Sequence, residues 1–203
     1  MTASEAAVPR HGPRERMVRS AMALICAQGV SGTGMREVVQ HAEAPRGSLQ
    51  HYFPGGKEQL ISEALALAGR TAARTARRAG EGDGPLAPSD VLAAMVAPWR
   101  TWLSESEYAQ GCPVLATVAD VAFSSASLRG AAEEAFDTWQ AAVEAALREA
   151  GVAAERVHPL AGTLIAALEG AIAMARARRS LQPLDDLVEQ LTPFLDGLVE
   201  ADR

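Results

Sequence analysis

Apolar residues recur at three- and four-residue spacing along most of this chain, which is the pattern of helices that bury one face. The clearest case is a predicted helix over residues 182–200, whose apolar stripe is Leu184, Leu187, Val188, Leu191, Leu195 and Leu198. Alternating β-branched runs of four or more residues are absent, and aromatic residues make up only 4% of the chain. Because strands are enriched in both, the sequence predicts an all-α fold.

Glycine, proline and polar turns divide this pattern into about nine helices. We predict helices over residues 14–28, 35–41, 45–53, 57–79, 89–106, 113–122, 127–150, 155–179 and 182–200. Gly29 should close the first helix, Pro45 suits the first turn of the third, and Pro193 should bend or split the last. We expect a three-helix N-terminal domain over residues 12–56 and a larger helical domain over residues 57–203.

Charge is distributed unevenly along the chain, whose net charge is −6. Residues 1–79 contain eleven Lys or Arg and six Asp or Glu, a net charge of +5, whereas residues 80–203 contain eight and nineteen, a net charge of −11. Such asymmetry suggests that the N-terminal third meets a polyanion. The alternative is that its arginines form an ordinary solvated helix face.

Two short predicted helices, 35–41 and 45–53, follow each other closely and carry a distinctive set of polar residues. In the second, Leu49 and Phe53 lie four residues apart and should face the core. The residues on the other faces of this predicted helix are Arg46, Gly47, Ser48, Gln50, His51 and Tyr52. Arginine and amide side chains read base edges, hydroxyls bind phosphates, and glycine permits a close backbone approach. The pattern predicts a helix-turn-helix whose second helix enters the major groove of DNA.

This segment resembles the N-terminal domain of TetR-family transcriptional regulators over about residues 12–62. The matching elements are Thr33, Arg36–Glu37, Gly47–Ser48–Leu49, His51–Tyr52–Phe53 and Lys57–Glu58–Gln59–Leu60. The resemblance implies DNA contacts by Thr33, Arg46, Gly47, Ser48, Gln50, His51, Tyr52 and Lys57. Taken singly, Tyr52 has an alternative role in packing between helices, and His51 an alternative as an ordinary surface histidine.

Three residues depart from the family's pattern. Glu43 stands where the turn usually has glycine, so we expect that turn to be strained or differently shaped. Pro45 replaces the usual polar cap, and Gln50 replaces a common tyrosine. Gln50 is therefore a candidate base reader, with adenine as the base that its amide suits.

The last two predicted helices are a candidate dimer interface. A helix-turn-helix unit reads few base pairs, and such proteins pair to span half-sites ~34–36 Å apart. Small residues that permit close helix packing are Ala161, Gly162, Ala166, Ala167, Gly170, Ala171, Ala173 and Ala175. The resemblance implies a homodimer through these two helices, whereas the residues alone are equally consistent with a core within one chain.

Large apolar side chains gather in the middle helices and are candidate ligand-binding residues. They are Met95, Trp99, Trp102, Cys112, Phe123 and Trp139. Such side chains enclose aromatic or lipophilic ligands, or they supply bulk to an alanine-rich core. Segment 111–115 resembles the lincomycin-resistance-repressor-like branch of the family, whose sixth helix begins Gly-Cys-Pro. That resemblance implies a small-molecule effector.

Patterns typical of catalysis, metal binding and membrane insertion are missing from the sequence. It has no P-loop, dinucleotide-binding glycine pattern or G-x-S-x-G, and its four histidines stand apart from cysteine pairs. Cys26 and Cys112 are too few for a disulfide framework, and we interpret Cys112 as structural. No apolar run approaches the ~18–20 residues of a membrane span. We expect no cofactor, no metal, no membrane partner and a cytoplasmic location.

These patterns together predict a homodimeric repressor that a small lipophilic or aromatic effector releases from a palindromic DNA operator. Two alternatives belong to other classes of protein. One is a helical carrier that binds a small molecule without controlling transcription. The other is an all-α enzyme that uses Cys112 or a buried histidine.

Overall fold

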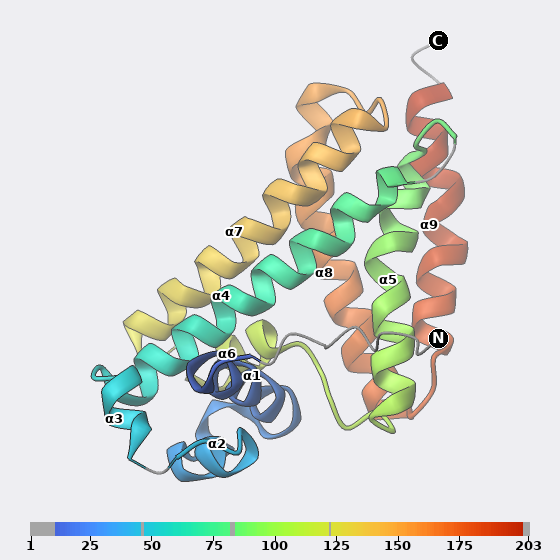
Figure 1. Cartoon of the computed structure of the whole chain (residues 1–203). Helices are drawn as coiled ribbons and strands as arrows, with labels where there is room; N and C mark the ends of the chain where they lie inside the picture. The colour runs from blue at the N-terminus through green and yellow to red at the C-terminus, as the bar shows by residue number, and fades with distance from the viewer. Residues whose placement is uncertain (1–10, 46, 82–83, 122, 201–203) are drawn as a thin grey trace, which may run out of the picture.

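The computed structural model describes residues 11–45, 47–81, 84–121 and 123–200, without the side chain of Glu200. Over these residues the chain forms nine α-helices, a 3-10 helix and no strand, which confirms the predicted all-α fold (Figure 1). The helices are α1 Pro13–Gly32, α2 Met35–His41, α3 Ser48–Tyr52, α4 Gly56–Arg77, η1 Arg78–Glu81, α5 Pro88–Glu105, α6 Pro113–Val121, α7 Ala126–Glu149, α8 Ala154–Arg178 and α9 Gln182–Glu200.

Helices α1, α2 and α3 lie together at one end of the molecule, where α4 begins (Figure 1). From there α4 runs into the larger helical body and packs along α7. Helices α5, α8 and α9 complete this body, and α6 packs against both α1 and α7. The body is therefore joined to the N-terminal helices through α4 and α6.

The contact between α4 and α7 depends on a glycine. A Cβ atom on Gly69 would lie 2.6 Å from the carbonyl oxygen of Ala135 and 2.9 Å from its Cα atom. Atoms in packed interiors do not approach this closely without a shift of the backbone. Gly69 thus allows these two long helices to cross with their backbones almost touching.

Arg16 joins α1 to the end of α2. Its guanidinium donates hydrogen bonds to the carbonyl oxygens of Ala42 (2.9 Å), Glu43 (3.1 Å) and His11 (3.0 Å). The first two of these carbonyls belong to the turn that ends α2, where backbone acceptors lack partners within the helix. This arginine therefore stabilises the turn of the helix-turn-helix unit.

Helices α1, α3 and α9 show the main differences from the sequence prediction. Helix α3 begins at Ser48 rather than Pro45, because the amide and hydroxyl of Ser48 both donate to the Pro45 carbonyl (3.0 and 2.6 Å) and form a turn there. Helix α9 continues through Pro193 and is not split. Gly29 does interrupt α1 as predicted, with φ 74° and ψ 178°, although a further helical turn follows it.

Among the described residues, α8 is the helix whose length and composition would allow it to cross a membrane, over an 18-residue window. However, 44% of that window is buried inside the protein, where α8 packs against α5, α7 and α9. These contacts are those of a core helix in a helical bundle.

The turn between α2 and α3 places Glu43 in the left-handed region, at φ 48°. Side chains other than glycine are strained there by about 1–2 kcal/mol, so Glu43→Gly should raise the free energy of unfolding by about 0.5–1 kcal/mol after the added entropy of the unfolded chain is subtracted. Urea titration measures the change. Glu43→Ala is the control, since it removes the same carboxylate but keeps the Cβ atom. An equal gain in both variants would show that charge, not backbone strain, is responsible.

Candidate functional site

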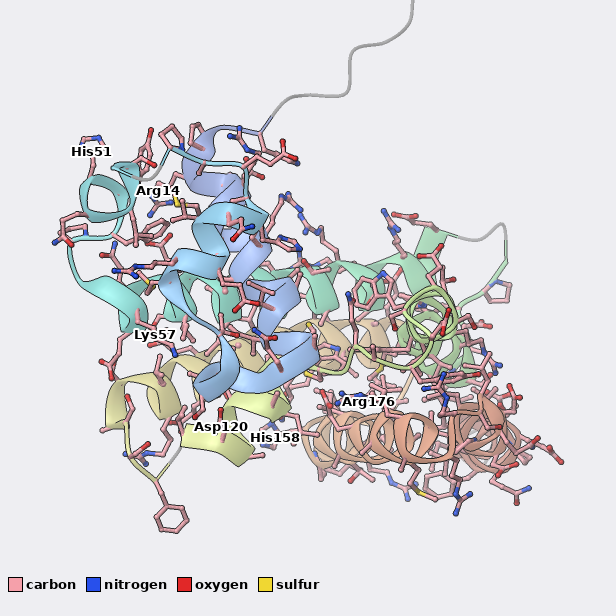
Figure 2. All side chains as sticks on the ribbon, turned by 90° about the horizontal axis from the view of Figure 1, so that it is seen from below. Arg14, His51, Lys57, Asp120, His158 and Arg176 are labelled. Atoms are coloured by element: carbon pink, nitrogen blue, oxygen red, sulfur yellow. The ribbon has the colours of Figure 1, made fainter. Side chains whose placement is uncertain are left out.

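The inner face of α3 is held against α1 and α4. Phe53, which follows α3, is fully buried, and Leu49 is half-buried, as predicted. The guanidinium of Arg14 lies 5.5 Å from the centre of the Phe53 ring and pairs with Glu63 of α4 at 2.6 Å. Figure 2 shows Arg14 near α3, and 51% of its side chain is exposed. These contacts fix the position of α3 on the rest of the molecule.

The outer face of α3 is polar and accessible. Gly47, Gln50 and His51 are exposed, and His51 projects from the edge of the molecule in Figure 2. Tyr52 is half-buried, with its ring 4.9 Å from that of His51 in an edge-on arrangement. Ser48 is also half-buried, and its hydroxyl already donates to Pro45. Arg46, also predicted at this face, lies outside the described residues.

Two of the residues predicted to contact DNA lie elsewhere. Thr33 is only 2% exposed, and its hydroxyl donates to the carbonyl oxygen of Gly29 at 2.7 Å. Lys57 is half-buried, and its ammonium donates to the carbonyl oxygen of Val30 at 2.6 Å. Figure 2 shows Lys57 directed inward, away from the edge where His51 lies. Both side chains stabilise the broken end of α1.

Helix α6 contacts that same end of α1 through Asp120 (Figure 2). Its carboxylate accepts hydrogen bonds from the amide (2.6 Å) and the hydroxyl (2.8 Å) of Ser31. The hydrogen bond from the Ser31 amide has the largest effect, followed by the one from its hydroxyl, and both lower the pKa of Asp120 from its ordinary value. Gly29 passes so close that a Cβ atom on it would lie 3.1 Å from the carboxylate. The body of the protein is thus bonded directly to the helix-turn-helix unit.

Four of the six predicted ligand-binding residues line one cavity. Trp99, Trp102, Cys112 and Trp139 surround it. Its remaining walls come from α1, α4, α5 and α6 and are Met22, Cys26, Ala68, Gly69, Thr71, Ala72, Thr75, Pro98, Pro113 and Val114. Trp99 and Trp102 are neighbours on one helix, α5, so their sequence spacing already places them together. Only the fold brings residues of α1 and α4 to the same cavity.

The structure does not bring the other two predicted residues to this cavity. Phe123 follows α6 and is fully exposed, because the turn between α6 and α7 carries it away from the core. Met95 is 1% exposed and belongs to the packed interior rather than to the cavity wall. We therefore correct the predicted set by leaving out both residues.

The cavity is small, at about 60 Å³. Pockets for drug-sized molecules have volumes of roughly 300–1,000 Å³, so a ligand can enter only if side chains move apart. Trp102 is 41% exposed and packs edge-on against Trp99, with ring centres 5.2 Å apart. It forms the wall closest to solvent and is the side chain best placed to move.

Two polar groups near the cavity are buried without partners. The indole nitrogen of Trp139 and both carboxylate oxygens of Glu169 form no hydrogen bond with any described residue. Burial raises the pKa of Glu169 from 4.5 to about 7, against a smaller lowering by the Cys112 thiol beside it. Buried polar groups are nearly always hydrogen-bonded in proteins, so these two groups are exceptions among the described residues.

Cys112 is buried and Cys26 is half-buried, and the pKa of each thiol is raised. Burial raises the pKa of Cys26 to about 12, and burial followed by the nearby Glu169 raises that of Cys112. A thiol nucleophile must be deprotonated, so neither cysteine is activated in this structure. Among the described residues, no three His, Cys, Asp or Glu side chains are grouped to hold a metal ion.

Sequence reasoning missed Glu169 and Asp120. Glu169 is the only charged residue between His158 and Arg176, and a lone charge in an apolar helix was a usable signal. Asp120 gave no signal, since its partner Ser31 lies 89 residues away in the sequence.

The arrangement defines a class of protein: a helix-turn-helix unit with an exposed reading helix, joined to a helical body that contains an apolar cavity. Residues 18–64 match the profile described as bacterial regulatory proteins, tetR family, and residues 88–190 match the LmrA/YxaF-like C-terminal domain of transcriptional regulators. The chain belongs to the TetR family and is a DNA-binding transcriptional regulator. The enzyme alternative is rejected, because the family and its relatives are regulators.

Relatives of similar length support this assignment. The uncharacterized HTH-type transcriptional regulator Rv0196 of Mycobacterium tuberculosis is 38% identical over 91% of this chain and 94% of its own. The HTH-type transcriptional regulator LmrA of Bacillus subtilis is 30% identical over 84% and 90%. The fold is also that of a TetR transcriptional regulator from Legionella pneumophila, with a TM-score of 0.80 at 18% identity over 93% of this chain and 100% of that one.

The raised pKa of Glu169 predicts a specific pH dependence of stability. Because the folded protein holds this proton more tightly than the unfolded chain does, the stabilisation is complete below about pH 4.5 and is lost as pH rises through about 7. The free energy of unfolding of the wild type should fall by about 2–3 kcal/mol between pH 5 and pH 8, and Glu169→Gln should remove this fall. Urea titrations at both pH values measure this slope. Glu189→Gln, at an exposed position of α9, is the control and should keep the wild-type slope.

Proposed function

We propose that this regulator is a repressor, which binds a palindromic operator as a homodimer in the cytoplasm and leaves it when a small lipophilic or aromatic effector binds. The observation that carries the proposal is the exposed polar face of α3, which Phe53 anchors at the end of the molecule (Figure 2). A helix fixed in this way can enter the major groove as a rigid element. Residues 12–56 would form the DNA-binding domain and residues 57–203 the effector-binding and dimerisation domain.

Within α3 we assign base reading to Gln50 and, before the helix, to Arg46. His51 and Tyr52 lie at the next positions and suit phosphate contacts, as does the half-buried Ser48. Gly47 is exposed, and a Cβ atom on it would meet no described atom within 4 Å, so the DNA backbone can approach it closely. For Thr33 and Lys57 we propose an indirect role, because both hold the end of α1 that supports α2.

Helices α8 and α9 form the proposed dimer interface. The exposed side of α8 carries Ala166, Gly170, Ala173 and Met174, and Met174 is 45% exposed. On α9, Phe194 is 52% exposed. Small residues beside large exposed apolar ones are suited to close packing of helices from two chains. A second copy would bury this surface and place two α3 helices on one face of the DNA.

Effector binding is coupled to DNA through helices that the cavity and the helix-turn-helix unit share. Helix α4 contributes Ala72 to the cavity and begins directly after α3. Helix α6 contributes Val114 to the cavity and bonds to α1 through Asp120. A ligand that enlarges the cavity moves one or both helices and changes the distance between the two α3 helices. The effector then selects a state that cannot span both half-sites.

Binding to DNA upstream of the protein's own gene tests the repressor proposal directly. We expect a specific complex in a gel-shift titration, with affinity that falls as salt is raised. Absence of any specific complex, even at low salt, would instead support the alternative of a carrier that binds a small molecule without controlling transcription.

Gln50→Ala should relax the preference at one base pair in each half-site by about 1–3 kcal/mol, because the amide makes its hydrogen bonds to one base. Competition between operators that differ at single base pairs measures this preference. Gln40→Ala is the control, since Gln40 is exposed on α2 rather than α3. It should change the affinity for all operator sequences by the same factor. A uniform loss for Gln50→Ala would refute base reading.

Asp120→Asn should weaken operator binding about tenfold, equally for all sequences, because it removes a charge-assisted hydrogen bond worth about 1–2 kcal/mol that orients α1 and α2. The amide of Ser31 should also exchange its hydrogen faster. The control is Asp196→Asn, since Asp196 accepts from the amide (3.2 Å) and hydroxyl (2.9 Å) of Ser89 in the same way but joins α5 to α9. Equal losses of operator affinity would mean that general destabilisation is the cause.

A further inference from the structure

Glu169 is a buried carboxylate for which the described part of the protein supplies no partner stronger than the weakly donating Cys112 thiol. It lies on α8, is 5% exposed, and neither of its oxygens accepts a hydrogen bond from a described residue. From Pro159 to Ala175 it is the only charged residue of the helix. An unpaired carboxylate in an apolar interior is costly, and a ligand that supplies a positive charge would offset that cost.

The groups that face Glu169 do not neutralise it. Cys112, at the start of α6, and Cys26, on α1, are both neutral thiols at physiological pH because burial raises their pKa. Arg176 lies two turns further along α8, but its guanidinium donates to the carbonyl oxygens of Tyr108 (3.4 Å) and Ala109 (2.9 Å). Helix α7 faces this region with Phe136 and Gln140, neither of which titrates.

Glu169 lies close to two concave sites, a cavity and a groove. On one side is the tryptophan-lined cavity, which Cys112 beside the carboxylate also lines. On the other is an apolar groove of about 510 Å³ between α6, α7 and α8, lined by Glu169 itself. In the proposed homodimer a second copy covers Ala166, Gly170 and Ala173 of this groove, so a ligand would approach the carboxylate from the cavity, past the partly exposed Trp102.

The tryptophan-lined cavity and the carboxylate beside it together have the chemistry of a cation-binding site. The faces of tryptophan rings attract positive charge, and a desolvated carboxylate pairs with it more strongly than an exposed one does. A neutral aromatic ligand would leave Glu169 unpartnered, as it is without a ligand. We propose that the effector of this regulator is a lipophilic cation, whose charge pairs with Glu169 and whose apolar part lies against Trp99, Trp102 and Trp139.

This inference rests on the proposed function and predicts how binding depends on pH. Because burial raises the pKa of Glu169 to about 7, the carboxyl must release its proton when a cation binds. For a permanently charged ligand, affinity should rise roughly tenfold from pH 6 to pH 8. The two thiols stay protonated over this range, so Glu169 is the group in this cluster that titrates.

The test compares benzyltrimethylammonium with neopentylbenzene, its uncharged carbon isostere, on the full-length protein. The two probes have almost the same shape, so any difference in affinity reports the charge. Tryptophan fluorescence follows binding, because all three tryptophans of the chain line the cavity. We expect the cation to bind the wild type at least tenfold more tightly at pH 8, and Glu169→Gln to abolish both this preference and its rise with pH.

Two further variants separate charge pairing from structural damage. Glu189→Gln removes a charge from an exposed position and should leave the preference for the cation intact. Trp102→Leu alters a partly exposed wall of the cavity and should weaken the cation and its isostere alike, because the apolar part that both probes share lies against this ring. Far-ultraviolet circular dichroism confirms that each variant is folded.

Three results would overturn the inference. One is a preference for the cation that Glu169→Gln leaves unchanged, and the second is tighter binding of the neutral isostere by the wild type. The third is a failure of the cation to bind while Glu169→Gln shifts the dimer dissociation constant, which would assign the carboxylate itself to the dimer interface instead of a ligand site. Gel shifts with operator DNA are independent of these results, so loss of DNA binding would refute the repressor proposal and leave cation binding to be judged separately.

Discussion

The close crossing of α4 and α7 is the constraint on which the rest of the structure depends. Gly69 brings the two backbones together where a Cβ atom would lie 2.6 Å from the Ala135 carbonyl oxygen. Helix α4 is also the element that carries the helix-turn-helix unit, and Gly69 lines the tryptophan cavity. One crossing thus affects both the course of α4 and the shape of the cavity, and the proposed effector response would act through it.

Charge has a different role in the structure from the one that its distribution along the chain suggests. The N-terminal third is basic by sequence, yet Arg14 and Arg19 form ion pairs with Glu63 and Glu15. Arg16 donates to backbone carbonyls instead. Two of these arginines, Arg14 and Arg16, therefore hold α1 to α4 and α2. The acidic body, with a net charge of −11 over residues 80–203, would be repelled by DNA, which restricts contact to the N-terminal helices.

The helices and the face of α3 were predictable because each depends on local spacing. Leu49 and Phe53 turn inward as their four-residue separation requires, so Gln50 and His51 are left exposed. Predictions based on a single residue's usual role were less reliable. Lys57 was expected at a phosphate, but its ammonium reaches the Val30 carbonyl oxygen, 27 residues earlier. Such a contact depends on how α1 and α4 meet, and no local pattern contains that information.

By itself the sequence determined the helical class, the helix-turn-helix unit and the concentration of tryptophans in the middle of the chain, because periodicity and short motifs encode local structure. Only the tertiary structure decided which of these side chains share a cavity, and it excluded the fully exposed Phe123. It also left Glu169 buried without a partner among the described residues. Burial and pairing arise from contacts between helices far apart in the chain, so they exist only once the helices have packed.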